Sequence, residues 1–567
     1  MAFAITQTCC NDASCVSVCP VNCIHPTPDE PDFGTTEMLY VDPRTCIDCG
    51  ACADACPVDA IFPVDRLMGP DRVYAELNRQ YYDTHDVIDT EDTEDTGSAG
   101  NTDNAWGKPR FPRSLPHEVG TLRIAVVGTG PAASYAAQSL LRTTGAEVTM
   151  IDRMPVPGGL VRFGVAPDHP STKKVGDSFA ALYRHPRLNL QLNVDVGTDV
   201  THAEIMAHHH AVIYAVGAAN DRTLGVPGED KAGSISATEF VGWYNSHPDI
   251  DPDAVDLSAT RAVVVGNGNV ALDVARILVT DPDRLAATDI ADHALAALRR
   301  SRVREVVVLG RRGPGQAAFT RPEFLALRQL PGVDVVVDDH VDAGRAAIAS
   351  AGPGSKAALF GDVPLVKVDW SAPPPEGRRI VFRFRSAPSA LCGDERVDSV
   401  RVVRDAGSGQ ESHVDALRAG LVIRSIGYRS APVPDLPFDE ATDTVPHKAG
   451  RVTTTVTGEH LPGTYVVGWV KRGPSGGIGA NRTCSAETVD SLLDDAAAGR
   501  LPEPAGSARE FARLVRRRQP DALGRREMLA IDRAERRRGV ESGLDRPRVK
   551  FATVPDLLRA GRRFGGR

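Results

Sequence analysis

The cysteines are concentrated at the start of the chain, and their spacing suits iron–sulfur chemistry. Nine of the eleven lie before residue 57. The second half of this stretch reads Cys46-x2-Cys49-x2-Cys52-x3-Cys56-Pro57. Where a protein holds two cubane clusters, the three closely spaced thiolates of such a run bind one cluster and the fourth reaches the other. By this rule we predict a [4Fe–4S] cluster on Cys19, Cys46, Cys49 and Cys52.

A second iron–sulfur site is predicted on Cys9, Cys15 and Cys56. Its part of the chain, from Cys9 to Pro20, departs from the regular spacing. Cys9 and Cys10 are adjacent, and neighbouring side chains of an extended chain point to opposite sides, so the two are not expected to ligate one cluster together. Three thiolates suit a [3Fe–4S] centre. A second [4Fe–4S] cluster that includes Cys10 is the alternative, and the sequence leaves both open.

Zinc is the competing interpretation of paired cysteines. The run has a third cysteine at the same spacing, and its ends read Cys-Pro. Both features favour iron–sulfur clusters instead. A disulfide framework would spread its cysteines along the chain, and cluster thiolates need a reducing compartment, so we predict a cytoplasmic protein. The sequence has no run of 18 or more apolar residues, which argues against a membrane span.

A dinucleotide-binding fingerprint begins with a predicted strand at residues 122–127. The turn Gly128-Thr129-Gly130-Pro131-Ala132-Ala133 and an apolar-periodic helix follow it, and the next strand ends at Asp152. In this arrangement Gly128 and Gly130 permit a tight turn and close approach of the pyrophosphate, while Ala133 permits close helix–strand packing. The helix N-terminus faces the phosphates. Asp152 suits the hydroxyls of an unphosphorylated ribose.

A second fingerprint, starting at Gly266, differs from the first in the charge that ends its second strand. The strand at residues 261–265 runs into Gly266-Asn267-Gly268-Asn269-Val270-Ala271, and the strand at 305–310 ends in Arg311-Arg312. Guanidinium groups pair bidentately with phosphate oxygens, so the two arginines favour the 2′-phosphate of NADP. The sequence therefore predicts one FAD site and one NADP site.

Several longer segments carry a family resemblance. Pro155 to His169, Gly266 to Ala275, Arg311 to Pro314 with Gln316 to Glu323, and Gly468 to Asn481 resemble the adrenodoxin reductase type of ferredoxin–NADP reductase. Residues 1 to about 62 resemble seven-iron bacterial ferredoxins, which also carry a spare cysteine where Cys23 stands. The whole chain resembles a bacterial fusion of ferredoxin and ferredoxin–NADP reductase.

The resemblance implies roles for individual residues. It implies FAD contacts at Gly128, Gly130, Ala133, Asp152, Leu160, Val196, Trp469, Gly476, Gly477 and Ile478. It implies NADP contacts at Asn267, Gly268, Asn269, Val270, Arg311, Arg312, Glu323 and Gly476. It places His169 and Glu323 near the flavin and nicotinamide rings as the catalytic pair.

We expect a multidomain chain, in which an α+β bacterial ferredoxin fold precedes an α/β flavoprotein with two Rossmann-type domains. The iron–sulfur domain is predicted at residues 1–65. Residues 83–103 hold eight acids and no Lys or Arg, so 66–120 is predicted to be a flexible acidic linker. An NADP domain at 219–443 is predicted to be inserted into an FAD domain built from 121–218 and 444–567.

Charge is unevenly distributed between the two ends. Residues 1–63 carry nine acids and one arginine, whereas residues 508–567 carry eighteen Lys and Arg with eight acids. The arginines of the tail alternate with acids and apolar residues in helical fashion, which favours solvated helix faces over a nucleic-acid site. The alternative is a docking surface for an acidic ferredoxin.

The expected activity is that of an NADPH-dependent ferredoxin reductase with its own fused ferredoxin. A hydride passes from NADPH to FAD, and single electrons pass to the iron–sulfur clusters and on to a protein such as a ferredoxin or monooxygenase. The ferredoxin spacing argues against the flavin subunit of a glutamate synthase-like complex. A disulfide reductase needs a pair of cysteines near the flavin, which residues 121–567 lack. A redox sensor is the non-enzymatic alternative, and steady turnover of NADPH would exclude it.

Overall fold

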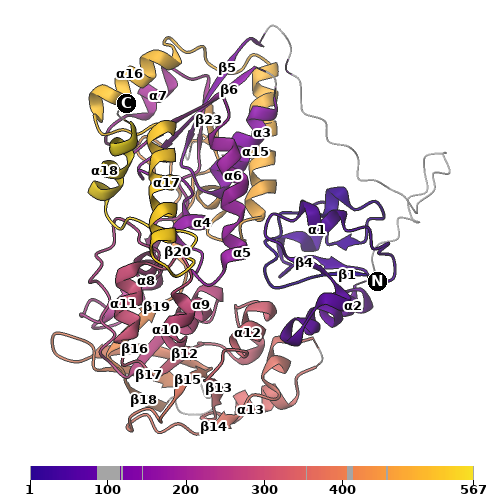
Figure 1. Ribbon diagram of the computed structural model, residues 1–567, viewed down its shortest axis with the longest axis vertical. Helices are drawn as coiled ribbons and strands as arrows, with labels where there is room; N and C mark the ends of the chain where they lie inside the picture. The colour runs from indigo at the N-terminus through magenta and orange to yellow at the C-terminus, as the bar shows by residue number, and fades with distance from the viewer. Residues whose placement is uncertain are drawn as a thin grey trace.

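A computed structural model describes residues 2–85, 115, 119–143, 145–352, 354–404, 413–454 and 457–565. Figure 1 shows a small N-terminal domain lying beside two larger α/β domains, close to α5 (Pro170–Lys173) and α12 (Arg321–Leu327). The multidomain architecture agrees with the fold class expected from the sequence.

The N-terminal domain is a small α+β fold. Strand β1 (Phe3–Ile5) pairs antiparallel with β4 (Ile61–Pro63), and β2 (Ile24–His25) pairs antiparallel with β3 (Tyr40–Val41). The short helix α1 (Ala51–Ala55) carries Cys52 and ends at Cys56, whose extended backbone precedes Pro57. These short elements leave the cysteines on loops and helix ends, where thiolates can converge.

Helix α2 (Val73–Thr84) corrects the predicted start of the linker, because it packs on the N-terminal domain. Buried Asn78 accepts hydrogen bonds from the N–H groups of Ile5 (3.1 Å) and Val41 (2.8 Å) and donates to the Ile5 carbonyl (2.8 Å). The Tyr82 hydroxyl donates to the carbonyls of Cys23 and Tyr40. The domain therefore extends to His85, and the acidic part of the expected linker lies outside the described residues.

The first nucleotide-binding fold is a seven-stranded sheet that the chain builds in two passes. Its order is β21-β22-β23-β8-β5-β6-β7. The first pass supplies β5 (Leu122–Val127), β6 (Ala146–Asp152), β7 (Leu188–Leu192) and β8 (Ala211–Tyr214). The second supplies β21 (His447–Lys448), β22 (Arg451–Thr453) and β23 (His460–Val466), and β23 runs parallel to β8.

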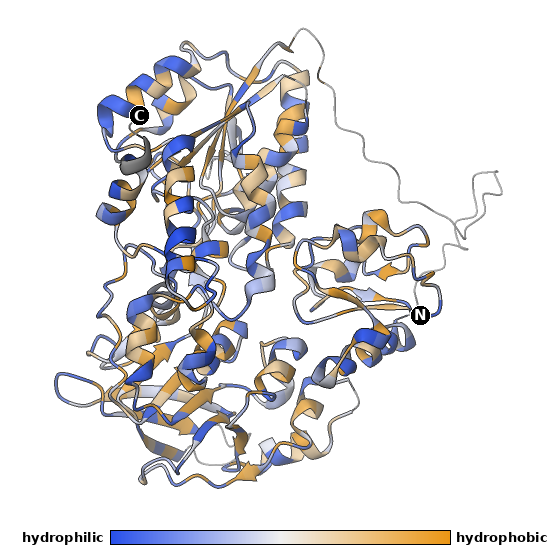
Figure 2. Cartoon of the chain, in the orientation of Figure 1, coloured by the Kyte–Doolittle hydropathy of each residue, from blue (hydrophilic) through white to orange (hydrophobic). Residues whose placement is uncertain are grey.

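The second nucleotide-binding fold is a seven-stranded parallel sheet whose strands all come from residues 234–424. Its order is β10-β19-β11-β12-β15-β13-β14. The strands are β10 (Ser234–Ser236), β11 (Arg261–Val265), β12 (Glu305–Leu309), β13 (Val333–Asp338), β14 (Leu365–Val366), β15 (Arg378–Arg383) and β19 (Leu421–Arg424). Every residue of β11 and β12 is buried, as expected of parallel strands covered on both faces. Figure 2 shows apolar strands in this sheet.

The two passages between the nucleotide-binding folds lie side by side. Strand β9 (Asn220–Asp221), on the way into the second fold, pairs antiparallel with β20 (Tyr428–Arg429), on the way out. The second fold also contains α13 (Asp342–Ala349) and a three-stranded antiparallel sheet of β16 (Ser386–Cys392), β17 (Ser399–Arg404) and β18 (His413–Arg418). The paired crossings join the two folds through adjacent strands.

The basic C-terminal region forms helices α16 (Ala508–Arg518), α17 (Arg525–Glu541) and α18 (Val554–Gly565). Its cations pair with acids of the nucleotide-binding folds: Arg518 with Glu204, and Arg546 with Asp292. Figure 1 shows these yellow helices on the side away from the N-terminal domain, so the fused domain itself does not dock on them. None of the described helices is long and apolar enough to cross a membrane.

Candidate functional site

The two glycine turns have the same local design. Gly128 follows β5 with φ 110°, and Gly266 follows β11 with φ 117°, so both need the left-handed region that favours glycine. A Cβ on Gly128 would lie 2.6 Å from the carbonyl oxygen of Ala215, and one on Gly266 would collide with the Ser425 carbonyl. Gly130 and Gly268 instead face open space, with no atom within 4 Å of an added Cβ.

Helices begin directly after these open glycines. Helix α3 (Pro131–Arg142) starts after Gly130, and α9 (Asn269–Val279) starts after Gly268. A helix N-terminus presents unpaired N–H groups and positive potential to a phosphate. The space left by the two glycines and the donors behind it fit the pyrophosphate of a dinucleotide in both folds.

Asp152 and Leu160 lie near the first turn. Asp152 ends β6, accepts a hydrogen bond from the Met154 N–H (2.8 Å) and is bonded by the Thr129 hydroxyl. Burial raises the pKa of its carboxyl. Leu160 is the first residue of α4 (Leu160–Phe163) and is 43% exposed, so its side chain is free to cover a bound group. Val196 lies farther along, half-buried against the core beside β7.

The second turn opens into a cavity of ≈ 780 Å³. Among its lining residues are six of the seven positions predicted for NADP on this fold, namely Asn267, Gly268, Asn269, Val270, Arg311 and Arg312; the seventh, Glu323, is not among them. Arg311 and Arg312 follow β12 and are exposed. Arg222 and Tyr428 also line the cavity and were not predicted from the sequence, because they come from elements distant in the chain. Gln316, four residues after Arg312, lines it too.

Asn267 and Asn269 have a structural task that their place in the fingerprint did not reveal. The Asn267 carbonyl accepts from the Phe319 N–H (2.8 Å), and the Asn269 side chain accepts from the Thr320 N–H (2.8 Å). Thr320 immediately precedes α12, which carries Glu323. The turn that lines the cavity therefore also fixes the helix that bears the predicted catalytic carboxylate.

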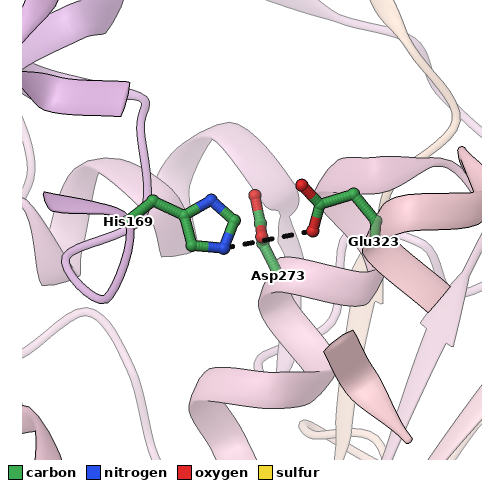
Figure 3. Close-up of side chains that lie close together, drawn as sticks. All are labelled: His169, Asp273 and Glu323. Atoms are coloured by element: carbon green, nitrogen blue, oxygen red, sulfur yellow. Dashed lines mark ion pairs between the residues drawn. The ribbon is translucent and has the colours of Figure 1, made fainter. Parts of the chain in front are cut away.

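His169, Asp273 and Glu323 converge from three elements (Figure 3). His169 lies just before α5, Asp273 on α9 and Glu323 on α12. The His169 Nε2 and Glu323 Oε2 atoms are 4.0 Å apart, so the structure brings the predicted catalytic pair together. Burial raises the pKa of Glu323, with His169 acting against it.

Arg276 organises the acids of this cluster. Its guanidinium bonds Asp168 (2.7 Å) and Asp273 (2.6 Å), and its Nη1 lies 3.6 Å from Glu323 Oε2. Burial acts to raise the pKa of Asp168, but Arg276 outweighs it and the pKa is lowered. Asp273 and Arg276 were missed in the sequence. Their spacing of three along α9 was the available signal, since it places both on one face of the helix.

The segment after β23 lies between the first glycine turn and the N-terminal domain. A Cβ on Gly468 would lie 2.8 Å from that of Ala132, at the start of α3. Trp469 begins α14 (Trp469–Arg472) and stacks on Tyr428, with ring centroids 5.4 Å apart. Gly476 and Gly477 are exposed, and Ile478 is half-buried. This segment carries all of the later FAD positions that were predicted.

Two contacts bring the N-terminal domain to this segment and to the His169 cluster. Gln7 Nε2 donates to Glu323 Oε2 at 3.4 Å. The Gly479 N–H, just before α15 (Ala480–Ala497), donates to the Cys10 carbonyl at 2.8 Å. Gln7 was not a candidate from the sequence, since only the folded chain brings residues this far apart into contact.

The thiols of the N-terminal domain lie close together, and all described cysteines are free. Cys52 is influenced electrostatically by Cys46, Cys19 and Cys49. Cys15 is influenced by Cys9 and Cys56, and also by Cys52. The division of these cysteines into two sets of ligands stays a prediction. Convergent thiols that form no disulfide are the donor set that an iron–sulfur cluster needs.

Cys23 lies beside two of the cysteines predicted to bind the [4Fe–4S] cluster, Cys19 and Cys46. Its Sγ lies 3.4 Å from that of Cys19. Hydrogen bonding by the Cys23 thiol lowers the pKa of Cys19 to about 6 and that of Cys46 to about 5. The spare cysteine therefore favours the thiolate form of two predicted ligands.

Comparisons with known proteins agree with both parts of the chain. A 4Fe-4S binding domain matches residues 39–62, and the pyridine nucleotide-disulphide oxidoreductase family matches residues 122–309. A probable ferredoxin/ferredoxin–NADP reductase of Mycobacterium tuberculosis is 48% identical over 564 residues, which cover 99% of this chain and 95% of the relative.

Other relatives match the reductase part. The NADPH-ferredoxin reductase FprA of Mycobacterium leprae is 44% identical over 79% of this chain and 99% of its own length. The solved structure of Mycobacterium tuberculosis FprA in complex with NADPH covers 78% of this chain and 99% of its own, with 42% identity and a TM-score of 0.68. Together with the full-length match, these findings show that the chain belongs to the family of ferredoxin/ferredoxin–NADP reductases.

Proposed function

We propose that this chain oxidises NADPH and delivers the electrons singly, by way of FAD and its own iron–sulfur domain, to a separate redox protein. Nicotinamide moves two electrons as a hydride, a cluster accepts one, and flavin does both. One observation carries the proposal: the N-terminal domain meets both nucleotide-binding folds at one place, through Gln7 with Glu323 and Cys10 with Gly479.

We assign the NADP contacts to Asn267, Gly268, Asn269, Val270, Arg311, Arg312 and Glu323 of the second fold, and to Gly476 of the 468–481 segment. Arg311 and Arg312 stand at the end of β12, beside the cavity, where two exposed guanidinium groups suit a 2′-phosphate. The complex of the Mycobacterium tuberculosis relative with NADPH supports this choice of nucleotide.

In the first fold we assign FAD to Gly128, Gly130, Ala133, Asp152, Leu160, Val196, Trp469, Gly476, Gly477 and Ile478. The open space at Gly130 and the buried carboxylate of Asp152 support the dinucleotide part of this assignment. The approach of Gly468 to Ala132 supports the later part, because it brings the 468–481 segment beside the first turn.

His169 and Glu323 are proposed as the proton-handling pair. The hydride brings two electrons and one proton, and that proton has to leave when the electrons depart singly. Burial raises the pKa of Glu323, which suits a carboxyl that takes up a proton, and His169 Nε2 stands 4.0 Å away as its partner. Arg276 and Gln7 hold the Glu323 carboxyl from other sides.

In the N-terminal domain we propose a [4Fe–4S] cluster on Cys19, Cys46, Cys49 and Cys52. A [3Fe–4S] cluster, or a second [4Fe–4S] cluster, is proposed on Cys9, Cys15 and Cys56. The influence of Cys46, Cys19 and Cys49 on Cys52 supports the first of these sets. The acceptor is proposed to be an external ferredoxin or monooxygenase. The free thiols favour the reducing cytoplasm.

An anaerobic NADPH titration followed by visible absorption and EPR together tests the proposal. We expect the flavin band to bleach and reduced-cluster signals to grow after it. An isotropic signal near g of about 2 before NADPH would assign the second site as [3Fe–4S]. Bleached flavin with clusters that stay oxidised would contradict the internal route.

A further inference from the structure

The N-terminal domain is held on the nucleotide-binding folds by one continuous segment and two outlying acids. The segment is residues 7–14, which we call the docking segment. From it, Gln7 reaches Glu323, the Cys10 carbonyl accepts from Gly479, and Asp12 and Ser14 meet Arg482. The outlying acids are Glu37, which accepts from the Arg321 N–H (2.8 Å), and Asp59, which pairs with Lys174.

The fit at the centre of this contact is close. An added Cβ on Gly479 would collide with the backbone of Asn11, so the docking segment leaves no room for a side chain there. Gly479 directly follows Gly476, Gly477 and Ile478, which we assign to the flavin. The docking segment therefore lies against the part of the reductase from which electrons are proposed to leave.

Charge is complementary across the contact. Acids of the N-terminal domain face cations of the nucleotide-binding folds in three places: Asp12 with Arg482 (3.3 Å), Glu37 with Lys356 (3.2 Å), and Asp59 with Lys174. The exposed Asp59–Lys174 pair contributes little affinity by itself, whereas Asp12 is buried at the contact. Together the three pairs set the orientation of docking. Three pairs spread around the domain fix which of its edges faces the flavin segment.

That edge is the one that carries the Cys9, Cys15 and Cys56 site. Cys9 lies within the docking segment, Cys15 directly follows it, and Cys56 precedes Asp59 by three residues. The other site is placed differently. Its Cys49 is exposed, and the neighbouring Ile47 is 58% exposed, so the loop that carries them opens to solvent.

From these observations we infer that electrons enter the iron–sulfur domain at the Cys9, Cys15 and Cys56 site and leave it from the Cys19, Cys46, Cys49 and Cys52 site. The inference rests on the proposed function and adds an order to it. Each transfer removes one electron from reduced flavin and adds one to the first site, which then reduces the second. Two transfers reoxidise the flavin, and its proton passes to solvent.

The order is tested by removing one ligand from either site in the full-length holoenzyme. In Cys15→Ser we expect NADPH to bleach the flavin as in the wild type, while rapid-freeze EPR loses the fast growth of the [4Fe–4S] signal. Dithionite, which reduces clusters directly, should still produce that signal. In Cys49→Ser, reduction of the first site by NADPH should persist and transfer to an added protein acceptor should be lost.

Each result of this experiment has a fixed meaning. Growth of the [4Fe–4S] signal in Cys15→Ser at the wild-type rate would overturn the inference. Failure of NADPH to bleach the flavin in the wild type would instead overturn the proposed function. If Cys15→Ser assembles no cluster that dithionite can reduce, a second variant that leaves every cysteine in place tests the order of transfer.

That variant is Arg482→Glu, which places a negative charge against Asp12 at the docking segment. Its matched control is Arg518→Glu, which breaks the Arg518–Glu204 pair on the side away from the N-terminal domain. Zero-length carbodiimide coupling of Asp59 to Lys174 and of Glu37 to Lys356, mapped by mass spectrometry, reports docking without using turnover.

In Arg482→Glu we expect both cross-links to be lost, together with the fast growth of the [4Fe–4S] EPR signal. In Arg518→Glu we expect both cross-links and the fast growth of this signal to be kept. Loss of the cross-links with an unchanged EPR phase would overturn the inference, because electrons would then enter without this docked edge. Unchanged cross-links and an unchanged EPR phase in Arg482→Glu would also count against it.

Discussion

The N–H of Gly479 donates a 2.8 Å hydrogen bond to the carbonyl of Cys10. This bond joins the segment that follows the last strand of the first nucleotide-binding fold to the cysteine-rich start of the chain. Both partners are backbone groups, and any side chain at Gly479 would collide with the backbone of Asn11. Side chains around it, above all Arg482, decide whether the two segments stay together.

The choice between NADPH and NADH should depend on Arg311 and Arg312. Each charge-assisted hydrogen bond contributes about 1.5–3 kcal/mol, so replacing both arginines with alanine should raise the KM for NADPH by roughly tenfold or more per arginine. The KM for NADH should change little, because NADH lacks the 2′-phosphate. Steady-state rates with a dye acceptor measure both. Equal losses for the two nucleotides would remove the assignment.

Arg276→Met should destabilise the protein, since it leaves Asp168 and Asp273 without their buried cation. Removing one partner of a buried ion pair costs about 3–5 kcal/mol. Thermal unfolding near neutral pH should show a clear fall in Tm. Phe324→Leu, a change of shape in the neighbouring core, is a control without a change of charge.

The destabilisation caused by Arg276→Met should also depend on pH. The pKa of Asp168 is lowered in the fold, so its ion pair stabilises the protein above the ordinary value of 3.8 and loses this effect as the pH falls through the lowered pKa. The difference in Tm between variant and wild type should therefore be greatest near neutral pH and shrink in acid. A difference that grows in acid would contradict this account.

Cys23→Ala should keep the [4Fe–4S] cluster, because Cys23 stands beside the predicted ligands without being one of them. The lost thiol hydrogen bonds to Cys19 and Cys46 should shift the reduction potential, since hydrogen bonds to cluster sulfur tune it. Iron and sulfide content should match the wild type, whereas Cys46→Ala should lose iron. Equal iron loss in the two variants would make Cys23 a ligand.

Asn78→Ala should weaken the N-terminal domain alone. It leaves the N–H groups of Ile5 and Val41 buried without their acceptor, and each unsatisfied buried group costs about 1–3 kcal/mol. The melting temperature of the cluster absorbance should fall while that of flavin release stays unchanged. Arg79→Ala, one residue on and exposed, is the control and should change neither. A shared fall in both transitions would contradict independent anchoring by α2.

Local patterns in the sequence were enough to find the cofactor-binding turns. Each glycine fingerprint is a contiguous segment, and the strand, turn and helix around Gly128 and Gly266 form as their spacing predicts. The cysteine run likewise grouped Cys46, Cys49 and Cys52, because the predicted ligands of this site lie within a few residues of one another.

Contacts between distant segments could not be found in this way. Gln7 carries no signal of its own until the fold brings it to Glu323. Composition places helix α2 in the predicted linker, because the acids that begin at Asp83 dominate it. Yet one face of this helix is buried, and it carries Tyr74, Leu77, Asn78 and Tyr82. A periodicity test on residues 73–82 alone would have separated the helix from the acidic stretch.

The parallel pairing of β8 with β23 has a consequence for how the protein is made. Strand β8 ends at Tyr214, and its partner begins at His460, so a ribosome must synthesise the whole second fold before the first sheet can close. Domains generally fold as units during synthesis. The second fold can therefore form before β23 has been synthesised and the first sheet is complete. Flavin uptake is therefore expected late in biogenesis, after residues 460–481 have emerged, and docking of the N-terminal domain follows it.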